Sequence, residues 1–264
     1  MIRQDSYYCK HCGKLVPPEG VYCKNCGLPM GPSFREETGE RRRGRSPVLL
    51  SGAERYSVAE RLWTSDRASV ELARDLRLGR QVLIRRPGTA IMASPDGLSA
   101  FLRALRTSAR LRHPGIAAVF EEGSDKDGPY AVIEFVEGQS LRDRMEKEGR
   151  IGLQEVLRLG VDIADALVYS HEQGVVHGNL TPSRVLLDSQ GRPRIHSFVR
   201  IEIPELPLRR GEFDPPDIQP LTPQVSDDVF SLGMLLRACL LGQPGPADDP
   251  AIPVSLREIL SGAL

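Results

Sequence analysis

Lysine is scarce in this sequence of 264 residues, although its formal charges balance at 35 Lys and Arg against 35 Asp and Glu. Counting along the chain gives only five lysines, and none lies between residues 25 and 125 or after residue 147. Any chemistry that requires a lysine in those stretches is therefore excluded. The five are Lys10, Lys14, Lys24, Lys126 and Lys147.

Net charge and long apolar runs are also missing. A formal net charge of zero argues against a dedicated nucleic-acid coat or a polyacidic tail, because both need a strong overall bias. The longest apolar-looking run, Val229 to Leu241, is broken by polar residues and is too short to cross a bilayer. No basic-then-apolar signal segment opens the chain. We therefore expect a cytoplasmic protein with no membrane span.

Four of the five cysteines lie in the first 26 residues, in two copies of the phrase Tyr-Cys-Lys-x-Cys-Gly that are 14 residues apart. The two sulfurs of a Cys-x-x-Cys pair can converge on one side of a tight turn that the following glycine permits. Two such turns supply four thiolates in the tetrahedron that zinc prefers. Two disulfides or a redox pair are the alternatives, but the doubled motif and the lack of a secretory signal favour zinc. The expected ligands are Cys9, Cys12, Cys23 and Cys26.

We therefore predict that residues 1–30 form a zinc ribbon, similar to the short ribbons at the ends of many bacterial proteins. The metal would be structural, because a closed four-cysteine site has no open position for catalysis. The fifth cysteine, Cys239, lies in an apolar segment and is expected in the core. Residues 31–52 are rich in glycine and proline around the basic run Arg41–Arg45, which predicts a flexible, Arg-rich linker. Nucleic-acid binding by that run is the alternative to a solvated tether.

From about residue 54 the hydrophobic pattern becomes globular. Apolar side chains at helical spacing predict one helix around residues 98–109 and a long one from Leu153 to His171. A capping box is expected at Ser140 and Asp143, and Ser226 is expected to cap another helix. The pattern predicts an α+β chain in which a β-rich part precedes a helical part. The expected β runs are Val82–Ile84, Ile116–Phe120 and Tyr130–Phe135.

Four stretches of the sequence have a characteristic order and spacing: Leu111–Ile116, Tyr130–Gly138, His177–Leu187 and Asp228–Gly233. On these stretches, the sequence from about Arg55 onward resembles a protein kinase domain of the bacterial Ser/Thr type. The resemblance implies a bilobal fold, with a small lobe over residues 53–137 and a shortened large lobe over residues 138–264. It also implies that the Asp228 carboxylate accepts hydrogen bonds from the backbone of the catalytic loop.

The small-lobe motifs of that family are altered. Trp63, Ser65 and Ala68 occupy the glycine positions of the phosphate-covering loop, where side chains stop backbone amides from closing over phosphates. The third-strand motif Val-Ala-Ile-Lys reads Val-Leu-Ile-Arg, so that Leu83 narrows the adenine pocket and Arg85 replaces the phosphate-binding lysine. Arginine keeps the charge but not the shape of lysine.

The large-lobe motifs are altered as well. The catalytic loop His-Arg-Asp-Leu-Lys-Pro-x-Asn reads His-Gly-Asn-Leu-Thr-Pro-Ser-Arg from His177 to Arg184. Asn179 replaces the catalytic aspartate, and an amide is not a base. The positions that the resemblance assigns to the lysine, its glutamate partner, the loop residues and the metal-binding aspartate hold Arg85, Ala104, Asn179, Thr181, Arg184 and Ser197.

These replacements predict a pseudokinase, not an enzyme, that acts as a scaffold through protein–protein contacts. ATP and Mg²⁺ are then unlikely cofactors, and zinc is the expected metal. The alternatives are a nucleotide sensor without phosphotransfer and a weakly active Ser/Thr protein kinase. The candidate contact surfaces are the ribbon, the segment Pro204–Pro220 and the end of the large lobe, including a helix over Ile252–Leu264. The degenerate nucleotide pocket comprises Trp63, Ser65, Ala68, Val70, Leu83, Arg85, Glu134, Val136 and Leu186.

Overall fold

The structure is a computed structural model, and it describes residues 55–94, 96–125, 127–198, 213 and 223–243. It also gives the backbone of three two-residue strands, β1 (Tyr7–Tyr8), β2 (Leu15–Val16) and β3 (Val48–Leu49). The four cysteines of the predicted ribbon, most of the predicted linker, the segment Pro204–Pro220 apart from Phe213, and Ile252–Leu264 lie outside the described residues.

The described residues fall into two compact units. The β-rich unit contains the residues up to Leu98 together with Phe120–Phe135, and the helical unit contains Ser99–Val119 and the residues from Val136 onward. A β-rich part and a helical part agree with the expected α+β class.

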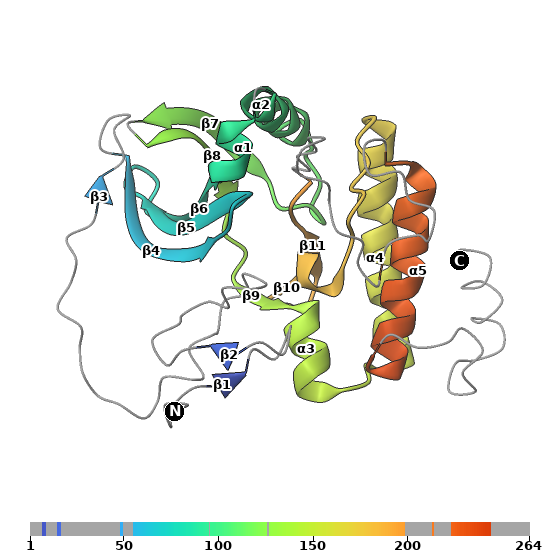
Figure 1. Cartoon of the computed structure of the whole chain (residues 1–264). Helices are drawn as coiled ribbons and strands as arrows, with labels where there is room; N and C mark the ends of the chain where they lie inside the picture. The colour runs from blue at the N-terminus through green and yellow to red at the C-terminus, as the bar shows by residue number, and fades with distance from the viewer. Residues whose placement is uncertain are drawn as a thin grey trace, which may run out of the picture. The chain divides into compact units, whose positions relative to one another are not determined.

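One sheet of six strands builds the β-rich unit, in the order β3-β4-β5-β6-β8-β7 (Figure 1). β3 pairs with β4, so two residues of the predicted linker extend the sheet. Two of the predicted strands are confirmed, in β6 and β8. The third is wrong at its start, because Ile116 makes an isolated bridge to Ile195 and the strand begins at Val119. The remaining strands are β4 (Tyr56–Thr64), β5 (Ala68–Asp75), β6 (Arg80–Pro87), β7 (Val119–Asp125) and β8 (Gly128–Glu134).

Strand periodicity divides the sheet into a buried and a part-exposed face. Side chains alternate between faces along each strand, so the even-numbered residues of β6 share one face. Val82 and Ile84 are fully buried there, while Leu83 and Arg85 on the opposite face are half-buried. The core on the buried face comprises Tyr56, Ala73, Val82, Ile84, Tyr130 and Val132.

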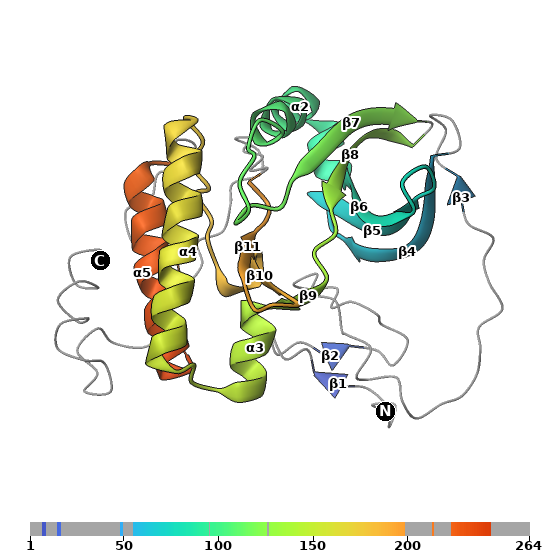
Figure 2. The same cartoon turned by 180° about the vertical axis from the view of Figure 1, so that it is seen from behind.

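The helical unit is built on two long helices that lie side by side, α4 (Leu153–Glu172) and α5 (Val225–Leu241), as Figures 1 and 2 show. Their close approach needs Gly160, because a Cβ there would lie 3.1 Å from a methyl carbon of Leu236. A small sheet of order β11-β10-β9 completes the unit. The other elements are α1 (Thr89–Ala93) in the β-rich unit, α2 (Gly97–Ser108), β9 (Gly138–Ser140), α3 (Leu141–Glu148), β10 (Val185–Asp188) and β11 (Pro193–Ile195).

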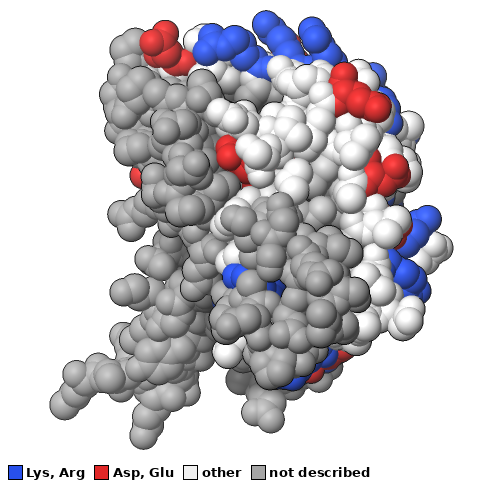
Figure 3. All heavy atoms as spheres, turned by 90° about the vertical axis from the view of Figure 1, so that its right-hand side faces the viewer, with Lys and Arg blue, Asp and Glu red and all other residues white. Residues whose placement is uncertain are grey.

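Both predicted helices form, but not every apolar side chain at helical spacing is buried. In α2, Phe101 and Leu105 are buried while Leu98 is exposed. In α4, Leu153 and Leu157 are exposed. Figure 3 views the molecule from the right-hand side of Figure 1 and shows an area with few charged side chains among the described residues. None of the described helices is long and apolar enough to cross a membrane.

The helix starts test two capping predictions. The capping box at α3 is confirmed, since Asp143 N–H donates to Ser140 Oγ (3.0 Å) and Ser140 N–H donates to Asp143 Oδ2 (3.2 Å). The predicted cap of α5 is wrong, because Ser226 lies inside the helix. Its N-cap is Gln224, whose N–H donates to Asp227 Oδ2 at 2.9 Å.

A buried carboxylate fixes the turn between β5 and β6. The Asp75 side chain is fully buried, and both of its oxygens accept from the Arg55 guanidinium, at 3.3 and 3.0 Å. The amides of Arg77 and Leu78 also donate to Asp75 Oδ1, at 3.1 and 3.3 Å. The hydrogen bond from Arg55 is the largest of the effects that hold the pKa of Asp75 below its ordinary value of 3.8.

The lowered pKa of Asp75 predicts a sensitivity to acid. A carboxyl whose pKa is lower in the folded chain stabilises the fold above its unfolded pKa, and this stability is lost as the pH falls through the folded pKa. We expect the Asp75→Asn variant to lose less free energy of unfolding than the native chain between pH 5 and pH 2, because the asparagine does not titrate. Urea unfolding over that range measures this loss. The exposed Asp127→Asn control should follow the native profile, and an Asp75→Asn profile parallel to the native one would contradict the prediction.

Candidate functional site

The first turn of α5 holds a buried carboxylate that anchors the loop after α4. The side chain of Asp228 is 0% exposed. Its Oδ2 accepts from His177 N–H at 2.8 Å, and its Oδ1 accepts from Gly178 N–H at 2.7 Å. His171 Nε2, near the end of α4, lies 2.7 Å from Oδ2. The expectation that Asp228 hydrogen-bonds the loop backbone is confirmed, and we call residues 175–184 the anchored loop.

The His177 side chain joins the anchored loop to the residues that follow β11. Its Nδ1 accepts from Asn179 N–H at 3.2 Å, so its Nε2 carries the proton and donates to the carbonyl oxygen of His196 at 3.1 Å. The ring also packs edge-on against Phe198, with 4.8 Å between ring centroids and 78° between planes. His177 therefore fixes the backbone of residues 196–198 against the loop.

His196 and Ser197 form a polar pair that the sequence analysis did not single out. His196 Nδ1 lies 2.7 Å from Ser197 Oγ, and His196 Nε2 lies 3.1 Å from the carbonyl oxygen of Ser183. The His196 N–H also donates to the carbonyl oxygen of Arg184 at 3.0 Å. Ser197 has φ +71°, which is positive and unusual for a residue other than glycine. The signal in the sequence was a histidine directly before the altered triplet at Ser197.

Within the helical unit, the structure gathers most of the predicted large-lobe positions around this pair. Asn179 and Thr181 lie in the anchored loop, and Arg184 ends its one-turn 3₁₀ helix, Pro182–Arg184. Leu186 follows in β10, opposite Arg194 of β11. The other two predicted residues of this unit lie in separate segments. Ala104 is in α2, where its carbonyl accepts from Ser108 Oγ, and Val136 precedes β9.

In the β-rich unit, the strand register brings four of the predicted pocket residues onto one face. Trp63 pairs with Val70, and Val70 pairs with Arg85, so the three form a row across β4, β5 and β6. Leu83 lies two residues from Arg85 on the same face. Glu134 pairs with Val82, which places its side chain on the opposite face.

The turn between β4 and β5 is closed by its own side chain. Ser65 Oγ accepts from the amides of Arg67 and Ala68, and Ser65 N–H donates to the Ala68 carbonyl at 2.8 Å. The turn also lies against the start of α1, where Ala90 N–H donates to the Asp66 carbonyl and a Cβ on Gly88 would clash with it. The backbone amides of Arg67 and Ala68 are therefore engaged within the protein.

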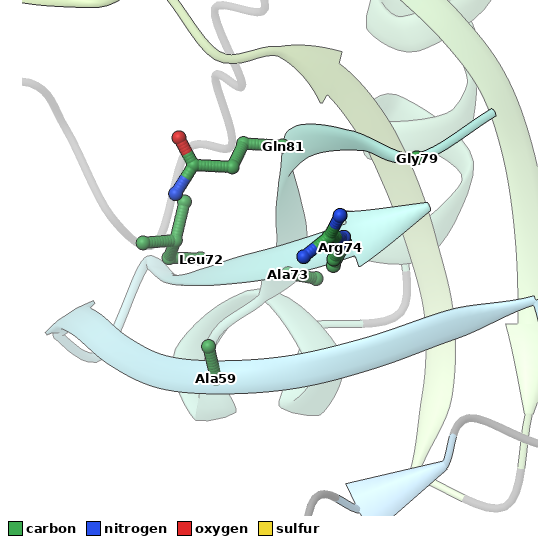
Figure 4. Close-up of a pocket in the computed structure, with 6 residues that line it drawn as sticks. All are labelled: Ala59, Leu72, Ala73, Arg74, Gly79 and Gln81. Atoms are coloured by element: carbon green, nitrogen blue, oxygen red, sulfur yellow. The ribbon is translucent and has the colours of Figure 1, made fainter. Parts of the chain in front are cut away.

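The described residues of the β-rich unit also form a hollow, shown in Figure 4. It lies on β4, β5 and β6 and contains none of the predicted pocket residues. Its lining comprises Ala59, Leu72, Ala73, Arg74, Gly79 and Gln81.

Two residues outside the loop have defined structural roles. Asp188 lies at the β10–β11 hairpin turn, where its Oδ1 accepts from the amides of Gln190 and Arg192. Cys239 is fully buried in the helical core, and burial raises the pKa of its thiol to about 12. Cys239 is therefore an unreactive core residue at neutral pH.

The comparisons with known proteins agree with this architecture. Residues 90–201 match the family model described as Protein kinase domain. The chain is 27% identical over 228 residues to the Ser/Thr-protein kinase PknB of Mycobacterium leprae, which covers 81% of this chain and 36% of that protein. It is 33% identical over 156 residues to a probable Ser/Thr-protein kinase, SCO3848, of Streptomyces coelicolor, covering 58% and 23%. The chain thus spans about a third of the first relative's length.

A solved structure has the same fold. The crystal structure of the Mycobacterium tuberculosis PknI kinase domain superposes with a TM-score of 0.67 at 22% identity, covering 84% of this chain and 91% of that chain. The chain therefore has a bilobal protein kinase fold, with a β-sheet part and a helical part. The fold is therefore that of protein kinase domains, and the sequence is similar to bacterial Ser/Thr-protein kinases.

These findings correct two predictions made from the altered motifs. The expectation that the chain is not an enzyme is contradicted, because the relatives that it matches over 81% of its length are named Ser/Thr-protein kinases. The expectation that zinc, not ATP with Mg²⁺, is the cofactor is contradicted by the same relatives, because protein kinases use ATP and Mg²⁺. The described residues contain no group of three metal-ligating side chains. The four cysteines lie outside those residues, so their role as ligands stays a prediction.

Because the Asp228 carboxylate holds the anchored loop, its removal should lower the free energy of unfolding by a large amount. Asp228→Ala leaves two buried amides and His171 without their acceptor, so we expect a loss of about 3 kcal/mol in the free energy of unfolding. Asp165→Ala is the matched control, because Asp165 also pairs with a histidine, His113 at 3.1 Å, but is 72% exposed. It should cost under about 1 kcal/mol. Urea unfolding of both variants measures the difference, and equal losses would contradict the assignment.

Proposed function

We propose that this chain is a weakly active Ser/Thr protein kinase domain, which transfers the γ-phosphate of ATP slowly to a hydroxyl of a protein substrate. The similarity to named Ser/Thr-protein kinases supports the class of reaction. The observation that carries the proposal is the anchored loop, held to the buried Asp228 carboxylate by two amides at 2.8 and 2.7 Å. Phosphoryl transfer depends mainly on positioning and charge neutralisation, so a rigid loop is its first requirement.

Two arginines supply the positive charge that phosphates need. Arg85 lies in β6, in the row with Trp63 and Val70, and Arg184 ends the anchored loop. A guanidinium stays charged at every physiological pH and matches phosphate oxygens with two parallel donors. In this proposal the side chain of Arg184, at the end of the anchored loop, contacts the phosphates of ATP.

The same residues explain why the rate is low. Asn179 stands in the anchored loop where a base is needed, and a positioned base contributes about 10²–10⁴-fold to a rate. Residues 175–184 and 196–198 include no carboxylate. Mg²⁺ prefers carboxylate, phosphate and water oxygens, so the ion would be held through ATP phosphates and water. The metal's contribution is charge neutralisation on the phosphates.

The proposal predicts a gain of function at one position. Asn179 is half-buried in the anchored loop, and Asn179→Asp supplies a carboxylate of nearly the same size. We expect it to raise transfer of radiolabelled γ-phosphate to a Ser/Thr-containing peptide by about 10²-fold or more. Asn179→Ala is the control and should keep the native rate, because it removes only an amide that takes no proton.

A contaminating kinase would give the same rate in all three proteins, so the comparison also identifies the source of the activity. Chelation of Mg²⁺ with EDTA should abolish transfer. ATP that stabilises the native chain against heat, with no phosphate transfer by the native chain or by Asn179→Asp, would contradict the proposal and would indicate nucleotide binding alone.

A further inference from the structure

We propose that Ser197 is an activated hydroxyl nucleophile, with His196 as its base, and that it accepts a phosphoryl group. The choice of ATP as the phosphoryl donor rests on the proposed function. The activation of the Ser197 hydroxyl does not depend on that function. The two residues are neighbours at the end of β11, and Ser197 Oγ lies 2.7 Å from His196 Nδ1. A nucleophile within hydrogen-bond reach of a base, itself oriented by a third group, is the arrangement that activates serine in enzymes.

The third group is the Ser183 carbonyl oxygen, which lies 3.1 Å from His196 Nε2. A carbonyl oxygen can only accept, so Nε2 carries the proton of the neutral ring. The other ring nitrogen, Nδ1, is then unprotonated and accepts from the hydroxyl of Ser197. The protonation pattern that a general base requires is therefore set by a backbone atom of the anchored loop.

The backbone of His196 is fixed as firmly as its ring. Its N–H donates to the Arg184 carbonyl at 3.0 Å, and its carbonyl oxygen accepts from His177 Nε2 at 3.1 Å. Since His177 is itself held by Asp228, the base is connected to the buried carboxylate through two hydrogen bonds. These contacts hold the His196 imidazole in one orientation relative to the Ser197 hydroxyl.

Ser197 differs from the buried serines of the described residues in its hydrogen-bond partner. Ser140 Oγ donates to the Asp143 carboxylate at 2.7 Å within the α3 capping box. Ser108, Ser170 and Ser231 donate to backbone carbonyl oxygens at 2.8–2.9 Å, and a carbonyl cannot take the proton from them. Ser197 is half-buried and is the single non-glycine residue with a positive φ among the described residues. Conformations of this kind are costly and are found at functional sites.

The reaction balances without any further reagent. Ser197 Oγ attacks the γ-phosphorus of ATP, the bond from that phosphorus to the bridging oxygen breaks, and ADP leaves. The hydroxyl proton passes to His196 Nδ1. The product is phosphoserine at position 197 and an imidazolium that loses its proton to water.

The test uses the full chain in two parallel reactions. In the first, the protein is incubated with Mg²⁺ and ATP, and phosphate on the peptide containing Ser197 is quantified by mass spectrometry. In the second, no ATP is present, and a fluorophosphonate probe reports activated serines. There the Oγ–P bond forms, fluoride leaves and His196 again takes the proton.

Three variants separate the roles of the two side chains. Ser197→Gly removes the hydroxyl while permitting the positive φ, and should abolish both signals at this position. His196→Asn keeps an acceptor near the position of Nδ1 but is not a base, so both rates should fall by about 10²-fold. Ser189→Ala is the control, because Ser189 is an exposed serine of the β10–β11 turn outside the proposed site, and it should keep the native rates.

Phosphate and probe on Ser197, with the loss in His196→Asn, support the proposal. Probe labelling without phosphate from ATP upholds the activated hydroxyl but overturns its role as a phosphoryl acceptor, and phosphorylation of a Ser/Thr-containing peptide in the same reaction then decides the proposed kinase function separately. A Ser197 that neither ATP nor the probe modifies would overturn the proposal. Native rates in His196→Asn would also overturn it, because they would assign His196 a merely structural role.

Discussion

The carboxylate of Asp228 is the interaction on which the organisation of the helical unit depends. It is fully buried, and an ionised carboxylate is stable inside a protein only when donors surround it. His177, Gly178 and His171 supply those donors. The three come from the end of α4 and the loop after it, while Asp228 comes from α5, so one side chain joins both long helices to the anchored loop.

Hydrogen bonds connect Asp228 to residues farther along the chain. His177 donates to the carbonyl oxygen of His196, and the carbonyl oxygen of Ser183 in the loop orients the His196 imidazole so that its Nδ1 faces Ser197. The helical unit thus keeps its internal support, while Asn179 and Ser197 stand where the kinase resemblance places carboxylates and Arg184 stands where it places an asparagine. A rigid loop with weaker chemical groups is consistent with a slow phosphotransferase.

The sequence predicted the features that depend on local pattern. The capping box of Ser140 and Asp143 and the long helix α4 follow from spacing alone, and Asp228 followed from the resemblance. The exposure of Leu153 and Leu157 could not be predicted, because helical spacing does not say how much of the apolar face the neighbouring helix covers. The pairing of His196 with the Ser183 carbonyl joins two strand ends through folding, and no local pattern contains it. The altered motifs were also over-interpreted as loss of enzyme function, which the similarity to named kinases contradicts.

Amide hydrogen exchange of the anchored loop tests whether Asp228 holds it in one conformation. The account predicts that the amides of His177 and Gly178 exchange slowly in the native chain, close to the rate set by global unfolding, because both are donated to a buried carboxylate. Exchange as fast as that of the exposed hairpin residue Ser189 would contradict it, since the loop would then open without unfolding the helices around it.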